Sequence, residues 1–272
     1  MVSDLAIRYR EQGFAILDCG LRERVLALRA QFLRVFDTIA ATHRLGPVKE
    51  DADVVRLYHG ERRDLWVAAY DQLRQLPALY ALADDATLEK IQAAVGLRFP
   101  AFTAKIATRV DMPFGEGSMP TSAHQDYPTH LGSENSVTVW MPLHDVTVSD
   151  GALQVVPGSH RWGLLGSDRL LNDFVEPGKL RRREGANAHM QAPDELAGKF
   201  RDLEVRAGQA IVFSTFLIHR SGENTGSRIR WAINFRLNDL ASAGYARRLY
   251  YLNEQVRVKS SVPDFTPSFS EE

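Results

Sequence analysis

Two histidines and one aspartate have the residue types of a metal site. His124 and Asp126 are separated by one residue, and residues two apart in an extended strand point to the same face, so both can hold one ion while Gln125 turns away. His219, far downstream, would complete two imidazoles and one carboxylate on one face of an octahedron, an arrangement that leaves positions open on non-haem Fe(II) for a cosubstrate and oxygen. A lone His-x-Asp is common in surface loops, so the surroundings of His219 decide the interpretation.

The segment around His219 favours a site over a chance match. Residues 210–218 form an apolar run rich in β-forming residues, and a second such run covers residues 229–236. A turn that contains glycine and asparagine separates the runs, so they are expected to form a β-hairpin. Folding the hairpin at the middle of that turn places His219 opposite Arg230.

The second run predicts which face of the hairpin lines the site. Ser221 lies two residues after His219, shares its face, and is expected to join Arg230 in one pocket. The alternation of period two gives an apolar face of Ile229, Trp231, Ile233 and Phe235 and a polar face of Arg230, Ala232, Asn234 and Arg236. A guanidinium next to a metal needs an anionic partner and can bind a carboxylate through two hydrogen bonds, with a hydroxyl beside it.

Four stretches of the chain together resemble the phytanoyl-CoA dioxygenase-like group of Fe(II)/2-oxoglutarate oxygenases. They are residues 124–126 (HQD), residues 140–153 (WMPLHDVTVSDGAL), residues 156–160 (VPGSH), and residues 219–222 (HRSG) with Arg230 eleven residues after His219. The resemblance covers roughly residues 100–240 well and the N-terminal hundred residues loosely. The combination is far more specific than any single stretch.

The resemblance implies a double-stranded β-helix (jelly-roll, cupin-like) core and a set of site residues. It implies iron held by His124, Asp126 and His219. It also implies that Arg230 and Ser221 bind the far carboxylate of 2-oxoglutarate.

Four further residues are candidates for binding the cosubstrate or the substrate. Trp140 matches a family tryptophan that lines the cosubstrate pocket, and Thr138 shares a strand face with it as a further cofactor-binding candidate. Tyr127, directly after the metal pair, is a candidate substrate contact. So is Arg56, which is compared with a basic residue, usually lysine, that some family members use at the same pocket.

The reaction implied by the resemblance is hydroxylation of an unactivated C–H bond of a small metabolite, with Fe(II), 2-oxoglutarate and O2 required and succinate and CO2 released. Asp126 favours hydroxylation because family members that halogenate carry a small residue in its place. Desaturation and ring closure use the same ligands and stay open. Two other classes remain as alternatives, a cosubstrate-free cupin-type metalloenzyme and a non-catalytic metabolite-binding module on the same fold.

Length and periodicity predict one mainly β domain over residues 1–272 with flanking helices packed on one sheet. The N-terminal part, about residues 1–98, is expected to be helical at 3–12, 22–43, 64–82 and 86–95, with an irregular connector at 48–63 and one strand at 13–17. The jelly-roll core is expected over about 99–240, with strands that include 105–111, 137–143 and 152–156, and a C-terminal extension over about 241–272.

Residues 162–200 break the strand pattern and contain the basic cluster Lys179 to Arg183. We interpret the segment as a lid over the substrate, with a solvated charge run as the alternative. The cluster could hold the phosphates of an acyl-CoA, whereas a small polar or amphipathic metabolite suits a chain of this size. Residues 260–272 are expected to form a loose tail.

Three other histidines are interpreted without a metal role. His144 and the adjacent Asp145 point to opposite faces of a strand and cannot share an ion. His160 follows a turn and is expected to hydrogen-bond to backbone. For His130 we favour a surface position, with a substrate contact as the alternative.

Composition excludes several kinds of partner. With 33 basic and 34 acidic residues the net charge is −1, which provides no field to attract nucleic acid or an anionic membrane. No run approaches the roughly eighteen apolar residues of a membrane span. The single cysteine, Cys19, excludes an intrachain disulfide, and the N-terminus lacks the apolar core of a secretory signal. We therefore expect a cytoplasmic monomer or homodimer that acts on a small molecule.

Overall fold

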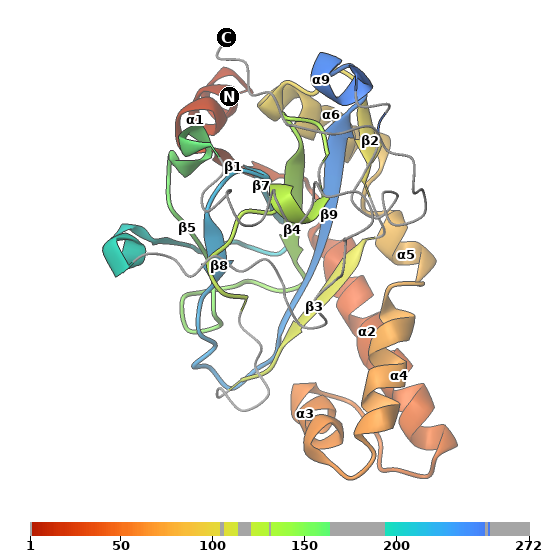
Figure 1. The fold of residues 1–272 in the computed structure, drawn as a ribbon. Coiled ribbons are helices and arrows are strands. Elements are labelled where there is room, and N and C mark those ends of the chain that lie inside the picture. The colour runs from red at the N-terminus through yellow and green to blue at the C-terminus, as the bar shows by residue number, and fades with distance from the viewer. Residues whose placement is uncertain are drawn as a thin grey trace, which may run out of the picture.

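Two antiparallel sheets and a layer of helices make up the fold (Figure 1). One sheet has six strands and the other three. The arrangement confirms the prediction of a mainly β core with flanking helices. The computed structural model describes residues 2–103, 106–113, 121–130, 132–163, 194–247 and 250.

The larger sheet pairs strands that lie far apart in the sequence. Its order is β1-β7-β4-β9-β2, and β3 also pairs with β9. Every pairing in it is antiparallel. Its strands are β1 (Phe14–Asp18), β2 (Pro100–Phe102), β3 (Ala107–Asp111), β4 (Val137–Pro142), β7 (Gln209–Ser214) and β9 (Arg230–Asp239).

The smaller sheet packs face to face with the larger one. Its order is β6-β5-β8, with β6 at Arg201–Leu203, β5 at Leu153–Val155 and β8 at His219–Ser221. Trp140 and Phe213 of the larger sheet belong to the same buried cluster as Val155 of the smaller sheet. The two sheets therefore enclose an apolar layer, as in a β-sandwich.

Helices cover the outer face of the larger sheet. The apolar side of β9 packs there, and Trp231 meets the rings of Phe32 and Phe36 with centroids 5.8 and 6.1 Å apart. The alternation predicted for residues 229–236 is thus confirmed. Those that pack there are α1 (Val2–Gln12), α2 (Arg22–Thr42), α3 (Asp51–His59), α4 (Arg63–Leu73), α5 (Pro77–Tyr80) and α6 (Asp85–Val95). Elsewhere lie α7 (Tyr127–His130), α9 (Ala243–Arg247) and the 3-10 turns η1 (Ser159–Trp162) and η2 (Asp194–Lys199).

Two predictions for the N-terminal part are wrong. Residues 48–63 are not an irregular connector, because Glu50 and Asp53 form a reciprocal capping box that starts α3. The single helix expected over 64–82 is divided into α4 and α5. The division falls before Pro77, which has no N–H to continue a helix and stands at the first position of α5.

The predicted β-hairpin is also wrong. β8 pairs with β5 in the smaller sheet, whereas β9 pairs with β4, β3 and β2 in the larger one. The turn between them therefore carries the chain from one sheet to the other, and the amide of Asn224 holds it by donating to the carbonyl oxygens of Arg228 (2.9 Å) and Asp111 (3.2 Å). His219 and Arg230 still face one region, because the two sheets face each other.

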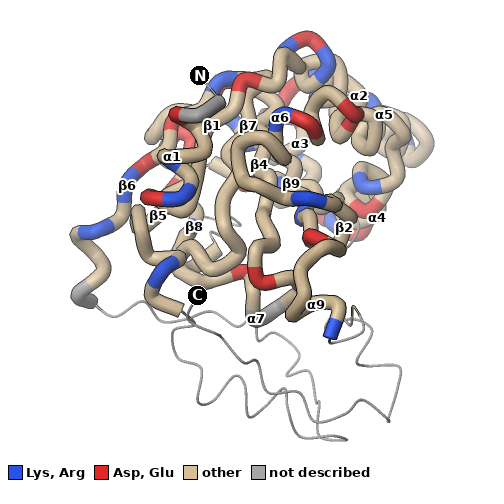
Figure 2. The backbone as a smooth tube through the Cα atoms, turned by 90° about the horizontal axis from the view of Figure 1, so that it is seen from above, with Lys and Arg blue, Asp and Glu red and all other residues tan. Residues whose placement is uncertain are grey.

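Several predicted features lie outside the described residues. They are the central part of the segment 162–200 with its basic cluster, most of the loop between β3 and residue 121, and the tail at 260–272. Within the described residues, no helix is long and apolar enough to cross a membrane. Basic and acidic residues are interspersed along the described chain (Figure 2).

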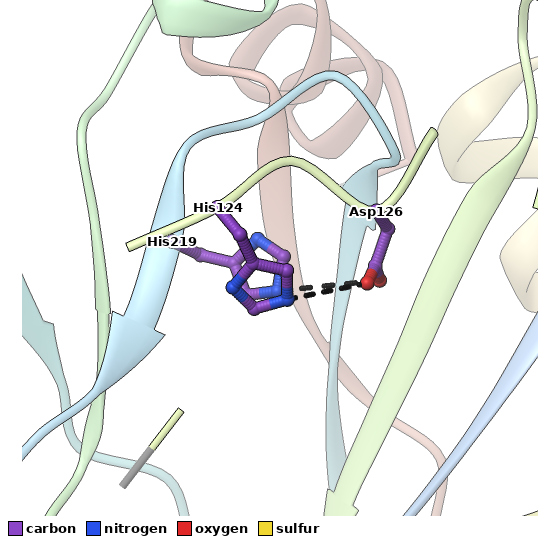
Figure 3. A group of neighbouring side chains, drawn as sticks. All are labelled: His124, Asp126 and His219. Atoms are coloured by element: carbon purple, nitrogen blue, oxygen red, sulfur yellow. Dashed lines mark ion pairs between the residues drawn. The ribbon is translucent and has the colours of Figure 1, made fainter. Parts of the chain in front are cut away.

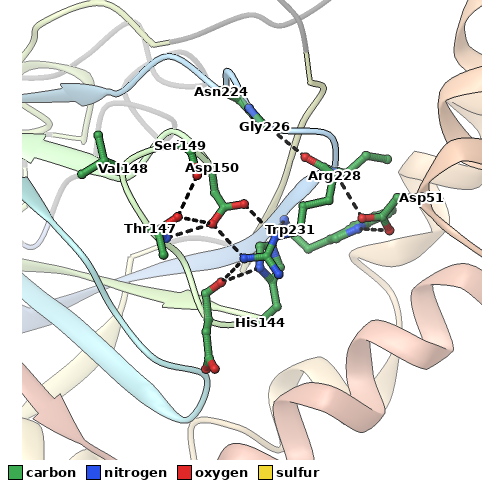
Figure 4. Close-up of polar contacts among 12 residues, drawn as sticks. Asp51, His144, Thr147, Val148, Ser149, Asp150, Asn224, Gly226, Arg228 and Trp231 are labelled. Carbon is green, nitrogen blue, oxygen red and sulfur yellow. Dashed lines mark hydrogen bonds and ion pairs between the residues drawn. The ribbon is translucent and has the colours of Figure 1, made fainter.

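A buried carboxylate joins the helical layer to β9. Asp51 accepts a hydrogen bond from Trp231 Nε1 at 2.9 Å (Figure 4). It also accepts the backbone N–H of Ile229 at 3.1 Å and pairs with Arg29 at 2.8 Å. Its side chain is almost fully buried. Three donors therefore depend on one residue of α3.

Asp51→Ala should lower the free energy of unfolding by about 3 kcal/mol, because it leaves buried donors without an acceptor and the Arg29 charge without a partner. Urea denaturation measures the change. The control is Asp71→Ala, which removes an exposed ion pair with Arg74 and should cost about 0.5 kcal/mol or less. Equal losses in the two variants would contradict the role given to Asp51.

A neutral imidazole is built into the same region. His144 Nε2 accepts the backbone N–H of Trp231 at 3.2 Å, and Nδ1 lies 2.9 Å from the carbonyl of Asp145. Burial lowers the pKa of His144 below its usual value. Protonation would direct a second N–H at the donor of Trp231, so the folded state favours the neutral ring.

This arrangement predicts a pH dependence of stability. At pH values between the lowered pKa of His144 in the folded protein and about 6.5, the imidazole is protonated in the unfolded chain but not in the folded one. The free energy of unfolding therefore falls as the pH drops below about 6.5. His144→Gln should reduce that slope by up to about 1.4 kcal/mol per pH unit. Urea denaturation of both proteins at about pH 7 and pH 5 tests this; identical slopes would refute it.

Candidate metal centre and active site

Backbone hydrogen bonds bring two distant histidines together. The N–H of His124 donates to the carbonyl of His219 at 2.9 Å, and the N–H of His219 donates to the carbonyl of His124 at 3.0 Å. Their rings lie with centroids 4.1 Å apart (Figure 3). The extended strand predicted at residue 124 is limited to this reciprocal pair, the only strand-like pairing within residues 121–130.

Asp126 completes the cluster from the same segment. Its Oδ1 lies 3.4 Å from His124 Nε2, and its Oδ2 lies 4.0 Å from His219 Nε2. The ligand atoms of the three residues all lie within 4.8 Å of one another. Gln125 turns away, as expected, and its amide donates to the carbonyls of Gly163 (2.8 Å) and Phe216 (2.7 Å).

Both imidazoles are oriented by backbone carbonyls. His124 Nδ1 lies 2.8 Å from the carbonyl of Ser122, and His219 Nδ1 lies 2.9 Å from the carbonyl of Leu217. A carbonyl accepts only from a protonated nitrogen, so the Nδ1 atoms carry the protons and the Nε2 atoms keep their lone pairs. Burial, and then the proximity of His124, lower the pKa of His219 to about 3. The ring is therefore neutral at ordinary pH, as a metal ligand must be.

Two donors from the larger sheet hold the Asp126 carboxylate. Arg236 pairs with it through two hydrogen bonds, Nε to Oδ2 at 3.1 Å and Nη2 to Oδ1 at 2.9 Å. The Thr138 hydroxyl donates to Oδ2 at 2.6 Å. Although burial raises the pKa of Asp126, the charge of Arg236 outweighs it and holds the pKa well below its usual range.

A second buried arginine lies on the same face of β9. Arg230 is 3% exposed, and its Nη2 donates to Ser221 Oγ at 3.2 Å. Its Nε donates to Asp111 Oδ2 at 3.0 Å, with Nη2 also on that carboxylate. Its guanidinium carbon lies 5.9 Å from the centre of the Trp140 ring. The predicted grouping of Arg230, Ser221 and Trp140 is thus present, although through two sheets and not through a hairpin.

Other candidate residues lie in different surroundings. Tyr127 is buried and stacks on Phe216, with ring centroids 4.2 Å apart. Arg56 lies on α3 with a largely exposed side chain, and pairs with Asp53 (3.0 Å) and the carbonyl of Pro47 (3.2 Å). The contacts of Arg56 are therefore with neighbours in its own segment, and its role at the cosubstrate pocket stays a prediction.

The remaining histidines partly match their interpretation. His160 Nε2 lies 3.2 Å from the carbonyl of Arg10, a backbone contact as expected. His130 is half-buried and not on the open surface, and burial followed by the charge of Arg236 lowers its pKa to about 4.

Arg236 and Asp111 are site residues that the sequence alone does not single out. Arg236 was placed on the polar face of the second run, so its alternation with Arg230 was a usable signal. Asp111 ends β3 directly opposite Arg230, a pairing that only the fold establishes.

Comparison with known proteins identifies the relatives of this chain. The family model for phytanoyl-CoA dioxygenase (PhyH) matches residues 9–232. L-proline trans-4-hydroxylase of Streptomyces griseoviridis is 27% identical over 207 residues, which cover 70% of this chain and 70% of that protein. Phytanoyl-CoA dioxygenase 1 of Oryza sativa subsp. japonica is 28% identical over 128 residues, 46% of this chain and 41% of that protein.

Solved structures support the same fold. The epimerase SnoN in complex with Fe3+, alpha ketoglutarate and nogalamycin RO superposes with a TM-score of 0.51 at 20% identity, over 88% of this chain and 83% of that one. At this identity the likeness concerns the fold alone. The family match spans most of the chain and includes the segments of all three clustered residues. This chain therefore belongs to the phytanoyl-CoA dioxygenase family and is an Fe(II)- and 2-oxoglutarate-dependent dioxygenase.

Proposed function

We propose that this dioxygenase hydroxylates an unactivated C–H bond of a small metabolite, converting 2-oxoglutarate to succinate and CO2. The observation that carries the proposal is the buried cluster of His124, Asp126 and His219. Two imidazoles with one carboxylate are the ligand set of non-haem Fe(II) oxygenases. The presence of the carboxylate supports hydroxylation, since halogenating family members lack it.

The donor atoms of the cluster fit Fe(II). The orientation of both imidazoles leaves their Nε2 lone pairs near the Asp126 carboxylate. His124, Asp126 and His219 would hold the ion, and bound iron with 2-oxoglutarate and oxygen would supply the oxidising power that breaks the C–H bond. The protein positions the ligands and excludes water from the buried cluster.

Arg230 and Ser221 would bind the distal carboxylate of 2-oxoglutarate. Arg230 Nη1 is buried and has no hydrogen-bond partner within the described residues, although Nε and Nη2 are engaged. Asn234 Oδ1, on the same face of β9, is likewise buried without a partner there. Buried polar atoms are rarely left unsatisfied, so both support a polar ligand along this face, and an anionic one at Arg230.

For the substrate we propose a small polar or amphipathic metabolite. The relative from Streptomyces griseoviridis is named for its action on L-proline, a molecule of this class. Such a substrate would bind with the C–H bond that is hydroxylated directed toward the iron.

An anaerobic titration tests the centre directly. Purified protein with Fe(II) should develop a weak visible charge-transfer band when 2-oxoglutarate is added, because the cosubstrate chelates the metal. Candidate metabolites can then be screened by succinate release. Iron binding without the band would favour the cosubstrate-free cupin-type enzyme, and absence of iron binding would contradict the proposal.

His219→Ala should weaken Fe(II) binding by at least about a hundredfold, since it removes one of three protein ligands. Isothermal titration under argon gives the affinity. His43→Ala is the control, because His43 is exposed at the end of α2. Parent-like Fe(II) affinity in His219→Ala would exclude His219 as a ligand.

Arg230→Ala should raise the 2-oxoglutarate concentration for half-saturation by about 10- to 100-fold, the loss expected for a charge-assisted hydrogen bond of about 1.5–3 kcal/mol. The charge-transfer band measures it. The control is Arg220→Ala, because Arg220 lies over the Phe200 ring at 3.9 Å and donates to Gln154. If saturation in Arg230→Ala matches that of the control, Arg230 does not bind the cosubstrate.

A further inference from the structure

A cross-strand row lies beneath the carboxylate of the metal cluster. Thr138 of β4 is the register partner of Arg236 on β9 and of Phe213 on β7. The Phe213 ring contacts His219, with centroids 4.6 Å apart. Neighbouring positions on β4, β7 and β9 therefore contact two of the three clustered residues, Asp126 and His219.

The two polar members of this row act on the same oxygen. Asp126 Oδ2 accepts from the Thr138 hydroxyl at 2.6 Å and from Arg236 Nε at 3.1 Å. A carboxylate oxygen has about two lone-pair sites for such contacts, so these donors occupy Oδ2. Oδ1 accepts Arg236 Nη2 at 2.9 Å and is the oxygen closer to an imidazole, 3.4 Å from His124 Nε2 against 4.0 Å from Oδ2 to His219 Nε2.

We propose that Thr138 and Arg236 are positioning residues that keep Asp126 Oδ2 away from the metal, so that the carboxylate offers the ion Oδ1 alone. The inference rests on the proposed metal site. A carboxylate that gave both oxygens would occupy one more position on the ion, and a chelating cosubstrate together with oxygen needs those positions. Thr138 thus acts through Asp126 and not through contact with the cosubstrate.

Burial makes this restraint effective. Thr138 is 1% exposed and Asp126 2%, so water does not replace a lost donor freely. Both donors come from the central strands of the larger sheet, whose backbone is fixed by neighbours on each side. The carboxylate therefore has one preferred orientation before any ion arrives, as preorganised ligand sets require.

The test compares Thr138→Val with Thr138→Ser in the full chain under anaerobic conditions. Valine keeps the size of threonine and removes the donor, whereas serine keeps it. The first readout is the visible spectrum of Co(II) bound without 2-oxoglutarate, which reports the ligand arrangement. The second is the affinity of the Fe(II)-loaded protein for 2-oxoglutarate.

Thr138→Val should change the Co(II) spectrum and weaken 2-oxoglutarate binding to the Fe(II)-loaded protein by about 10- to 100-fold. Thr138→Ser should resemble the parent. An unchanged Co(II) spectrum with weaker 2-oxoglutarate binding would overturn the inference, because it would make Thr138 a direct cosubstrate contact. Parent-like behaviour in both readouts would overturn it as well.

Arg236→Lys is the second variant and covers a failure of Thr138→Val to fold. Lysine keeps the charge but cannot donate to both oxygens in the planar geometry of a guanidinium, so the same two readouts should change. A parent-like Arg236→Lys would overturn the role of Arg236. If the parent itself binds Fe(II) but not 2-oxoglutarate, the proposed function fails, which is a separate result.

Discussion

A carboxylate buried between two β-sheets requires compensation of its charge, and the structure around Asp126 follows from that requirement. The side chain is 2% exposed, so water does not solvate it, and its partners must come from the protein. Arg236 supplies an opposite charge and Thr138 a neutral donor. The segment of Asp126 also carries His124, whose backbone pairs with that of His219. The ion pair and hydrogen bond that compensate the charge of Asp126 therefore also hold the segment that carries His124.

One face of β9 contributes to the stability of the fold, and the other face presents side chains to the candidate site. One face places Trp231 and its apolar neighbours against the helices, where Asp51 of α3 accepts the indole N–H. The other presents Arg230 and Arg236 to the space between the sheets. Because side chains alternate along a strand, packing of the apolar face determines where both guanidiniums lie. The helical layer thus fixes the site without contributing a clustered residue.

Local patterns in the sequence are sufficient for the alternation of β9 and for the helices α1, α2 and α6. Pairing between distant segments was not available, so His219 was placed opposite Arg230 in a hairpin, whereas β8 and β9 belong to different sheets. The same limit conceals the pairing of Asp111 with Arg230, which only the register of β3 and β9 establishes. The cluster itself was predictable because two of its members are close in sequence and the third ends a strongly β-forming run.

Charge balance connects the two arginines. Arg236 with Asp126, and Arg230 with Asp111, form two ion pairs whose formal charges cancel. If a divalent ion entered this site alone, two positive charges would be added to a buried region, which is unfavourable in a low dielectric. A dianionic cosubstrate bound both to the ion and to Arg230, as proposed above, would cancel that excess. The two ion pairs of the protein would therefore suit a dication and a dianion that bind together better than either ion alone.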